Sequence, residues 1–236
     1  MRLEDKTVLV TGSSSGIGRA ICEQLTKFGI KVIGLARHHK KFNPNIVNYV
    51  TYEIDIADLE SVGRKVKSIL KTHPEISGLV SNAGYGDFRN LENFSIEEII
   101  NFVNMNLISH IVITRQLLPH FKANKFGDII FIGSEASLSG SKKASLYCAS
   151  KFGLRGFAQS IRQESSDRNV RVSIVNPGMV RTSFFDKLNF KPGVNVDNAI
   201  EPEDIAKAVF DVLSMNEHTV IDEVNISPLK KVIQFN

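Results

Sequence analysis

Cysteine is scarce in this sequence: only Cys22 and Cys148 occur among its 236 residues. Two thiols are too few for the disulfide framework of a small secreted protein, and they fit a reducing compartment. Cys22 has the position of a helix core residue. Cys148 adjoins Tyr147, but no histidine or second cysteine completes a nucleophile or metal pattern around it. We therefore expect both cysteines to have structural roles.

Signals for a metal, a nucleic acid or a membrane are also missing. The six histidines show no ligand spacing, which predicts no metal site. The 29 lysines and arginines are dispersed among 25 acidic residues, and the longest basic cluster, residues 37–41, is better explained as a loop beside a cofactor than as a nucleic-acid patch. No apolar run approaches the ~20 residues of a transmembrane helix, and the first residues do not resemble a signal peptide. We expect a cytoplasmic protein without nucleic-acid or membrane partners.

No linker, repeat or low-complexity segment divides the chain. With 42% hydrophobic residues it can bury a full core, so residues 1–236 are predicted to form one domain. Strands are predicted at 7–11, 31–36, 48–54, 77–81, 127–133, 170–176 and 219–226, and helices at 19–28, 57–71, 95–122, 145–166 and 202–215. Such alternation predicts an α/β fold with a doubly wound parallel sheet of about seven strands and helices on both faces. Ligands of these sheets bind beyond the carboxyl ends of the strands.

A glycine-rich turn follows the first predicted strand. Gly12, Gly16 and Gly18 lie between the apolar run 7–11 and a segment with helical spacing, and a second β-like run follows at 31–36. Strand, turn, helix and strand form the βαβ unit of dinucleotide-binding domains, in which glycines let the backbone approach a pyrophosphate at the helix N-terminus. Although a glycine turn can be only a tight connection, this context predicts a Rossmann-type nucleotide site.

Tyr147 and Lys151 are four residues apart within a predicted helix. That spacing places both side chains on one face, about one turn apart. A nearby ammonium favours the phenolate form of a tyrosine, so the pair can donate and accept protons. Alone, such a pair is usually only an amphipathic helix edge with a solvated lysine.

Together these motifs resemble those of the short-chain dehydrogenase/reductase family, in its short single-domain branch. The resemblance rests on Thr11-Gly12-x3-Gly16-Ile17-Gly18, Asp55-Ile56, Asn82-Ala83-Gly84, Asn106, Ser134 thirteen residues before Tyr147, Tyr147-x3-Lys151, Pro177-Gly178 and Thr182. It runs over nearly the whole chain.

The resemblance implies a hydride transfer between a nicotinamide cofactor and a carbonyl or secondary alcohol. Tyr147 is then the acid and base, and Lys151 lowers its pKa and binds the nicotinamide ribose. Ser134 is expected to hydrogen-bond the substrate oxygen, and Asn106 to position a water chain that returns the proton to solvent. The residues implied for cofactor binding are Gly12, Ser14, Ser15, Gly16, Ile17, Gly18, Arg37, Asp55, Ile56, Asn82, Ala83, Gly84, Tyr147, Lys151, Pro177, Gly178, Val180 and Thr182.

The end of the second predicted strand favours NADP(H) over NAD(H), although NAD(H) stays open. NAD enzymes of this architecture place an acidic residue there for the ribose 2′-hydroxyl. Here Ala36 occupies that position and Arg37 follows, with Arg19 and Ser13 or Ser14 in reach of the same corner. A guanidinium pairs with phosphate in bidentate fashion.

The substrate side is less determined. Residues 179–200 are expected to form a lid, in which Phe184, Phe185 and Phe190 either line an apolar pocket or anchor the lid; Tyr85 is a further candidate wall. Glu135 departs from the small or polar neighbour familiar in the family, and the end of the chain departs from its Val-Asp-Gly-Gly stretch. The sequence does not identify the small carbonyl or alcohol substrate.

Other functions and an assembly are open at this point. The alternatives are a nucleotide-sensing regulator that lacks catalysis, an enzyme of epimerisation or dehydration with tightly held cofactor, and an NAD-dependent alcohol dehydrogenase. The helix at 145–166 and the stretch 101–118 carry more apolar residues than one buried stripe requires. These helices pair in relatives, so we expect a homodimer or homotetramer.

Overall fold

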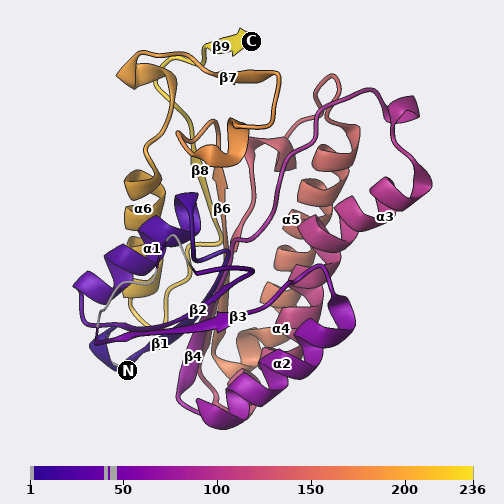
Figure 1. Ribbon diagram of the computed structural model, residues 1–236. Coiled ribbons are helices and arrows are strands. Elements are labelled where there is room, and N and C mark those ends of the chain that lie inside the picture. Colours follow the sequence, from indigo (N-terminus) through magenta and orange to yellow (C-terminus); the bar gives the residue numbers. More distant parts are fainter. Residues whose placement is uncertain (1–2, 40–41, 43–46, 236) are drawn as a thin grey trace.

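The computed structural model describes residues 3–39, 42 and 47–235. Its main sheet has seven parallel strands in the order β3-β2-β1-β4-β5-β6-β8 (Figure 1). These strands are β1 (Thr7–Thr11), β2 (Lys31–Ala36), β3 (Tyr49–Glu53), β4 (Ile76–Ser81), β5 (Gly127–Ile132), β6 (Val170–Pro177) and β8 (Glu223–Ile226). The direction of winding reverses between β1 and β4, which is where such sheets bind their ligands.

Helices cover both faces of the sheet (Figure 1). One layer holds α1 (Gly16–Lys27) and α6 (Pro202–Ser214), which pack on each other. The other holds α2 (Leu59–Thr72), α4 (Ser109–Asn124) and α5 (Ser145–Ser165). The predicted doubly wound Rossmann-type fold is confirmed.

The strands are apolar on both faces because each face meets a helical layer. In β1, Val8 and Val10 belong to the core under α1 and α6, whereas Leu9 belongs to the core under α2, α4 and α5. Successive side chains of a strand point to opposite faces, so a continuous apolar run supplies both cores. Because the seven strands are parallel, their carboxyl ends lie along one edge of the sheet.

The longest helical run, Ile96–Asn124, passes through α3 (Ile96–Val103), a π-helical turn η3 (Asn104–Ile108) and α4. It begins with a capping box in which Ser95 and Glu98 bind each other's backbone N–H. By length and composition alone this run could cross a membrane. Its apolar side chains Phe102 and Phe121 are buried in the protein, however, and Asn106 is fully buried at its middle.

A small antiparallel pair, β7 (Phe190–Pro192) with β9 (Ile233–Phe235), lies outside the main sheet. Neither strand is predicted from the sequence, and the last predicted strand of the main sheet begins only at Glu223. Gly193 N–H also donates to the Val232 carbonyl over 2.9 Å. The segment 228–235 thus lies along part of the predicted lid.

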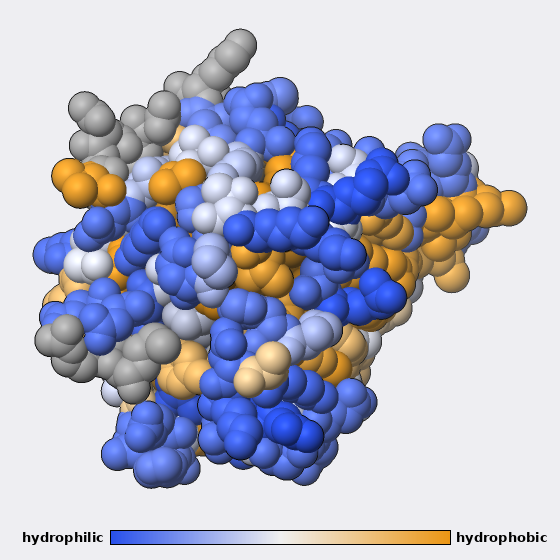
Figure 2. All heavy atoms as spheres, turned by 90° about the horizontal axis from the view of Figure 1, so that it is seen from below, coloured by the Kyte–Doolittle hydropathy of each residue, from blue (hydrophilic) through white to orange (hydrophobic). Residues whose placement is uncertain are grey.

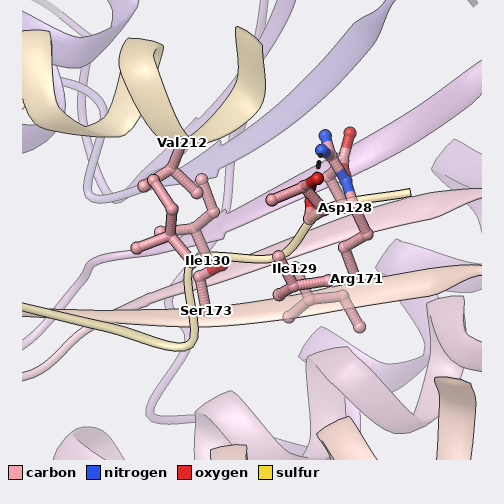
Figure 3. Close-up of a pocket in the computed structure, with 9 residues that line it drawn as sticks. Asp128, Ile129, Ile130, Arg171, Ser173 and Val212 are labelled. Atoms are coloured by element: carbon pink, nitrogen blue, oxygen red, sulfur yellow. Dashed lines mark hydrogen bonds and ion pairs between the residues drawn. The ribbon is translucent and has the colours of Figure 1, made fainter. Parts of the chain in front are cut away.

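A buried ion network joins the opposite, amino ends of β5 and β6 (Figure 3). Arg171 Nε lies 2.6 Å from Asp128 Oδ1, and Lys6 Nζ lies 2.5 Å from Asp128 Oδ2. The Arg171 guanidinium also donates to the carbonyls of Leu213 and Met215 at the end of α6. The residues around this network therefore form a structural junction at the amino edge of the sheet, opposite the strand ends that carry the sequence motifs.

Candidate active site

The glycine turn lies at the carboxyl end of β1, directly before α1. Gly12 and Gly16 have φ of +67° and +52°, in the left-handed region that strains L side chains. A Cβ on Gly18 would collide with the Gly12 carbonyl oxygen. Ser15, the N-cap of α1, makes no side-chain cap bond, and the first turn holds no acid. Such a helix N-terminus is suited to an anion.

Thr11 connects this turn to the end of β4. Its Oγ1 accepts hydrogen bonds from the backbone N–H groups of Asn82 and Ala83 at 2.9 and 3.0 Å, and its carbonyl accepts one from Asn82 Nδ2 at 2.9 Å. A Cβ on Gly12 would lie 2.8 Å from Asn82 Nδ2. The first and third motifs of the sequence are therefore packed against each other.

Gly84 brings the predicted site residues of two helices together. A Cβ on Gly84 would lie 2.7 Å from Asn106 Oδ1 and 4.0 Å from Lys151 Nζ. Asn106 occupies the π-helical turn, a feature frequent at functional sites. Its Oδ1 accepts from Tyr85 N–H at 3.1 Å, and its Nδ2 donates to the Phe102 carbonyl at 3.1 Å. The Asn106 side chain thus holds the loop after β4 against the π-helical turn.

Ser134, Tyr147 and Lys151 meet beyond the carboxyl end of β5. Ser134 is the N-cap of the short turn that follows this strand, and its hydroxyl is in hydrogen-bond reach of Tyr147. Lys151 Nζ donates to the Ile132 carbonyl over 3.0 Å and lies 5.8 Å from the centroid of the Tyr147 ring. All three side chains are buried. The geometry suits proton exchange with an oxygen placed beside both hydroxyls.

Burial is the largest influence on the pKa values of Tyr147 and Lys151. It raises the pKa of Tyr147 to about 12, against the smaller lowering effect of the Ser134 hydrogen bond. Burial also lowers the pKa of Lys151 to about 8. Desolvation of the phenolate is thus the main influence on the Tyr147 hydroxyl in this structure, and the lowering of its pKa by Lys151 stays a prediction.

The segment after β6, with the Pro177-Gly178 and Thr182 motif, lies beside the glycine turn. Pro177 ends β6, and Gly178 N–H donates to the Ile226 carbonyl over 2.8 Å. Val180 forms an isolated parallel bridge with Ile200, which closes the base of the segment 179–200. A Cβ on Gly16 would lie 3.3 Å from Thr182. The predicted lid therefore starts and ends beside the cofactor turn.

The predicted adenosine corner is more open. Ala36 is buried at the end of β2, and Arg37 after it is exposed. Arg19 is already engaged, with its Nε 3.0 Å from Glu23 and its guanidinium 4.7 Å from the Phe42 ring. Of the serines of the turn, Ser13 is fully buried, Ser14 is partly exposed and Ser15 is exposed.

At the end of β3, Asp55 is exposed and accepts from Ala57 N–H, while Ile56 is buried. In the described part of the chain, no hydrogen bond or ion pair links Arg37, Asp55 or Ile56 to Ser134, Tyr147 or Lys151. Of the predicted basic cluster 37–41, residues 40 and 41 lie outside the described residues.

Two residues near the site were not predicted. His110, one turn after Asn106, is fully buried, and its Nδ1 lies 2.7 Å from Ser81 Oγ. Burial, reinforced by the Lys151 charge, lowers its pKa to about 3. Phe88 lies with its ring centroid 5.2 Å from that of Tyr147. His110 lies four residues after Asn106, so helical spacing could have placed it near the site. Phe88 lies in a loop, where no such spacing indicates its position.

The remaining polar groups fit structural roles. Cys22 and Cys148 are buried free thiols, and Cys148 Sγ lies 3.7 Å from the Ser139 carbonyl. Among the residues that the structure describes, no three metal-ligand side chains gather into a group.

Fold and site together define a nucleotide-binding oxidoreductase. A profile of the family described as "short chain dehydrogenase" matches residues 6–192. The chain belongs to the short-chain dehydrogenase/reductase family.

Full-length relatives agree with this placement. The chain is 29% identical to an "NADP-dependent 3-hydroxy acid dehydrogenase" of Schizosaccharomyces pombe, over 96% of this chain and 94% of the relative. It is 30% identical to a "sepiapterin reductase" of Chlorobaculum tepidum, over 96% and 98%. A crystal structure of a metagenomic short-chain oxidoreductase in complex with NADP superimposes with a TM-score of 0.84 at 30% identity, over 97% of this chain and 99% of the other.

Proposed function

We propose that this protein is an NADP(H)-dependent oxidoreductase that transfers hydride between nicotinamide and a carbonyl or secondary alcohol carbon of a small molecule. The observation that carries the proposal is the buried Tyr147, with the Ser134 hydroxyl and the Lys151 amine beside it. Residues 1–236 act as one dinucleotide-binding domain in the cytoplasm, and 179–200 act as its substrate lid.

The residues present fit NADP(H). The uncapped N-terminus of α1 and the turn from Gly12 to Gly18 receive the pyrophosphate, and Arg37 receives the 2′-phosphate that an acidic residue at Ala36 would repel. Arg37 forms no ion pair in the described part of the chain, so its guanidinium is available. The name of one relative and the NADP complex of one structural neighbour support this preference.

The other proposed cofactor contacts come from segments directly after the carboxyl ends of β3, β4 and β6. Asp55 and Ile56 are assigned to the adenine side, Asn82 to Gly84 to the middle, and Pro177 to Thr182 to the nicotinamide side. When bound, the nicotinamide gives or accepts the hydride at the substrate carbon.

The chain's own residues handle the proton. Tyr147 gives its hydroxyl proton to the substrate oxygen in reduction and removes it in oxidation. Ser134 donates a hydrogen bond to the same oxygen as negative charge develops there. Lys151, held by the Ile132 carbonyl, keeps a cation behind the phenol, and Asn106 holds the loop that borders this space.

The test is turnover of a carbonyl panel with NADPH by the parent and by Tyr147→Phe. The variant keeps the buried ring and loses only the hydroxyl, so it should bind NADPH normally while kcat falls by ~10²–10⁴-fold. Near-normal turnover in Tyr147→Phe would reject the mechanism. NADPH binding without turnover of any carbonyl or alcohol would instead favour the regulator, and retained cofactor with substrate conversion but no net redox change would favour an epimerase or dehydratase.

A further inference from the structure

The ring nearest Tyr147 belongs to Phe88. Phe88 lies in the loop after Gly84, at the carboxyl end of β4, with its centroid 5.2 Å from that of Tyr147. It is only partly buried. A large apolar side chain in a loop would be stabilised by burial in the core. Phe88 instead stays partly exposed and lies beside the Tyr147 phenol.

Two rings from the predicted lid converge on the same place. Phe184 lies 6.0 Å from Tyr147 and 6.5 Å from Phe88, and Phe190 of β7 lies 5.1 Å from Phe88, centroid to centroid. We call Phe88, Phe184 and Phe190 the aromatic cage. All three are partly exposed, so they offer ring surface to a ligand as well as to one another.

The backbone leaves room for these rings. A Cβ on Gly86 would lie 2.5 Å from both Phe184 Cζ and Phe88 Cε2. Any other residue at 86 would therefore displace two members of the cage. On the outer side, Phe235 of β9 lies 6.5 Å from Phe190, and the pairing of β9 with β7 fixes the strand that carries Phe190.

Charges around the cage do not favour an anionic substrate. Glu135 is close enough to Tyr147 to disfavour a second negative charge there. Lys231 Nζ is 2.7 Å from Glu135 Oε1, and Arg89 pairs with both Asp87 and Glu98. Lys191 adjoins Phe190 in β7, and alternation along a strand directs it to the opposite face.

We propose that the aromatic cage selects an uncharged carbonyl or carbinol attached to a flat, apolar group such as an aryl ring, and that Phe88 is a specificity-determining residue. This inference rests on the proposed reductase function. Offset or edge-to-face stacking of the aryl group on the cage places its carbonyl at the hydroxyls of Tyr147 and Ser134. The lid phenylalanines Phe184 and Phe190 thus line the substrate pocket as well as anchoring the lid.

The experiment compares three substrates with NADPH: acetophenone, 4-acetylbenzoate and acetoacetate. The first two differ only in a carboxylate, and the third keeps the carboxylate without the ring. For the parent, kcat/KM should be at least ~10-fold higher with acetophenone than with either acid. The carboxylate of 4-acetylbenzoate would lose its hydration against the apolar rings of the cage, and acetoacetate has no ring to stack on them. A preference for either acid overturns the inference.

Phe88→Leu keeps an apolar side chain and removes the ring. It should lower kcat/KM for acetophenone by ~10-fold and change acetoacetate much less. Phe28→Leu is the matched control, since Phe28 lies at the end of α1 and packs on Phe210, away from Tyr147. Equal losses on all substrates would contradict the role of Phe88. If Phe88→Leu melts much earlier than the parent, Phe184→Leu is measured in the same way.

Binding separates this inference from the proposed function. Acetophenone and 4-acetylbenzoate are titrated calorimetrically into the NADP⁺-loaded parent and Phe88→Leu. Selective, Phe88-dependent binding without turnover would reject the reductase and keep the cage. Turnover of carbonyls without this selectivity would keep the reductase and reject the cage, and absence of acetophenone binding would likewise reject the cage.

Discussion

Arg37 and Ala36 form the corner that, in the function proposed above, distinguishes the two nicotinamide cofactors. Arg37 is exposed and Ala36 is small, whereas Arg19 already pairs with Glu23 and stacks on Phe42. We therefore expect the preference for NADP(H) to depend mainly on the Arg37 guanidinium. A hydrogen bond to a charged group contributes roughly 1.5–3 kcal/mol, which corresponds to about 10–100-fold in kcat/KM.

We predict that the double variant Ala36→Asp with Arg37→Ile loses this preference. The aspartate would accept from a ribose 2′-hydroxyl and repel a phosphate, so the ratio of kcat/KM for NADPH to that for NADH should fall by at least ~10–100-fold. Arg168→Ile removes an exposed arginine elsewhere on the surface and serves as control. An unchanged ratio in the double variant would show that another residue reads the phosphate.

His110 gives a second prediction at this scale, on the pH dependence of stability. Burial lowers its pKa from 6.5 to about 3 in the folded protein. Between these values the unfolded chain binds a proton that the folded protein does not, so stability falls as pH decreases through this window. From pH 6.5 to 4.5 the loss from this histidine is about 2–3 kcal/mol.

His110→Gln removes this titration while keeping a polar partner for Ser81. Its free energy of unfolding, from urea titrations at pH 4.5 and 6.5, should decrease less than that of the parent by about the same 2–3 kcal/mol. His218→Gln removes an exposed histidine as the matched control. If the parent and His110→Gln lose equal stability, His110 does not carry the acid sensitivity.

Among the elements, the junction of β5, β6 and α6 depends on one buried arginine. Arg171 pairs with Asp128 (Figure 3). Its guanidinium also donates to carbonyls at the end of α6, including those of Leu213 and Met215. Removing one partner of a buried ion pair typically destabilises by about 3–5 kcal/mol. Without Arg171, Asp128 would keep only Lys6 as a partner, and the carbonyls of Leu213 and Met215 would lose their donor.

Arg171→Met should therefore lower the free energy of unfolding by about 3–5 kcal/mol. Arg171→Lys keeps the charge but offers fewer donors, so its loss should be intermediate. Arg162→Met removes the exposed pair with Asp222 and should change stability by less than about 1 kcal/mol. Urea denaturation followed by circular dichroism makes the comparison; equal losses at 171 and 162 would contradict the importance of the junction.

The elements also show what local pattern can predict. The strand at 7–11 and the glycine turn follow from residue order alone, because apolar runs and glycines with positive φ have local causes. The β7–β9 pair joins two three-residue strands about forty positions apart, so no local period reveals it. Phe88 and the raised Tyr147 pKa depend on tertiary burial in the same way.

At the scale of the whole molecule, the burial of the apolar side chains of α5 changes the argument for the predicted homo-oligomer. Of the apolar residues of α5, Leu154 and Ile161 are buried in the core and Phe157 packs against Phe131, so only Phe152 is substantially exposed, at 43%. Leu154, Phe157 and Ile161 are therefore covered within the subunit itself. The surplus that remains is on α3, which packs against α5 and exposes Ile96 and Ile100 at 78% and 54%.

Apolar atoms gather on the side of the molecule where α3 projects (Figure 2). Contiguous exposed apolar surface of this kind typically marks a protein interface. We propose that the face formed by Ile96, Ile100 and Phe152 pairs with the same face of a second copy, since a two-fold contact uses one self-complementary patch.

The prediction is a homo-oligomer that a single charge in this face weakens. Size-exclusion chromatography with light scattering at micromolar concentration should give a dimer or tetramer for the parent and a smaller species for Ile100→Asp, because the buried charge would lack a partner. Leu229→Asp places the same charge on an exposed residue of the segment beside the lid and serves as control. A monomeric parent would reject the assembly. Dissociation by Leu229→Asp alone would move the interface from α3 and α5 to the face of the lid, where subunit contact and substrate entry would share one surface.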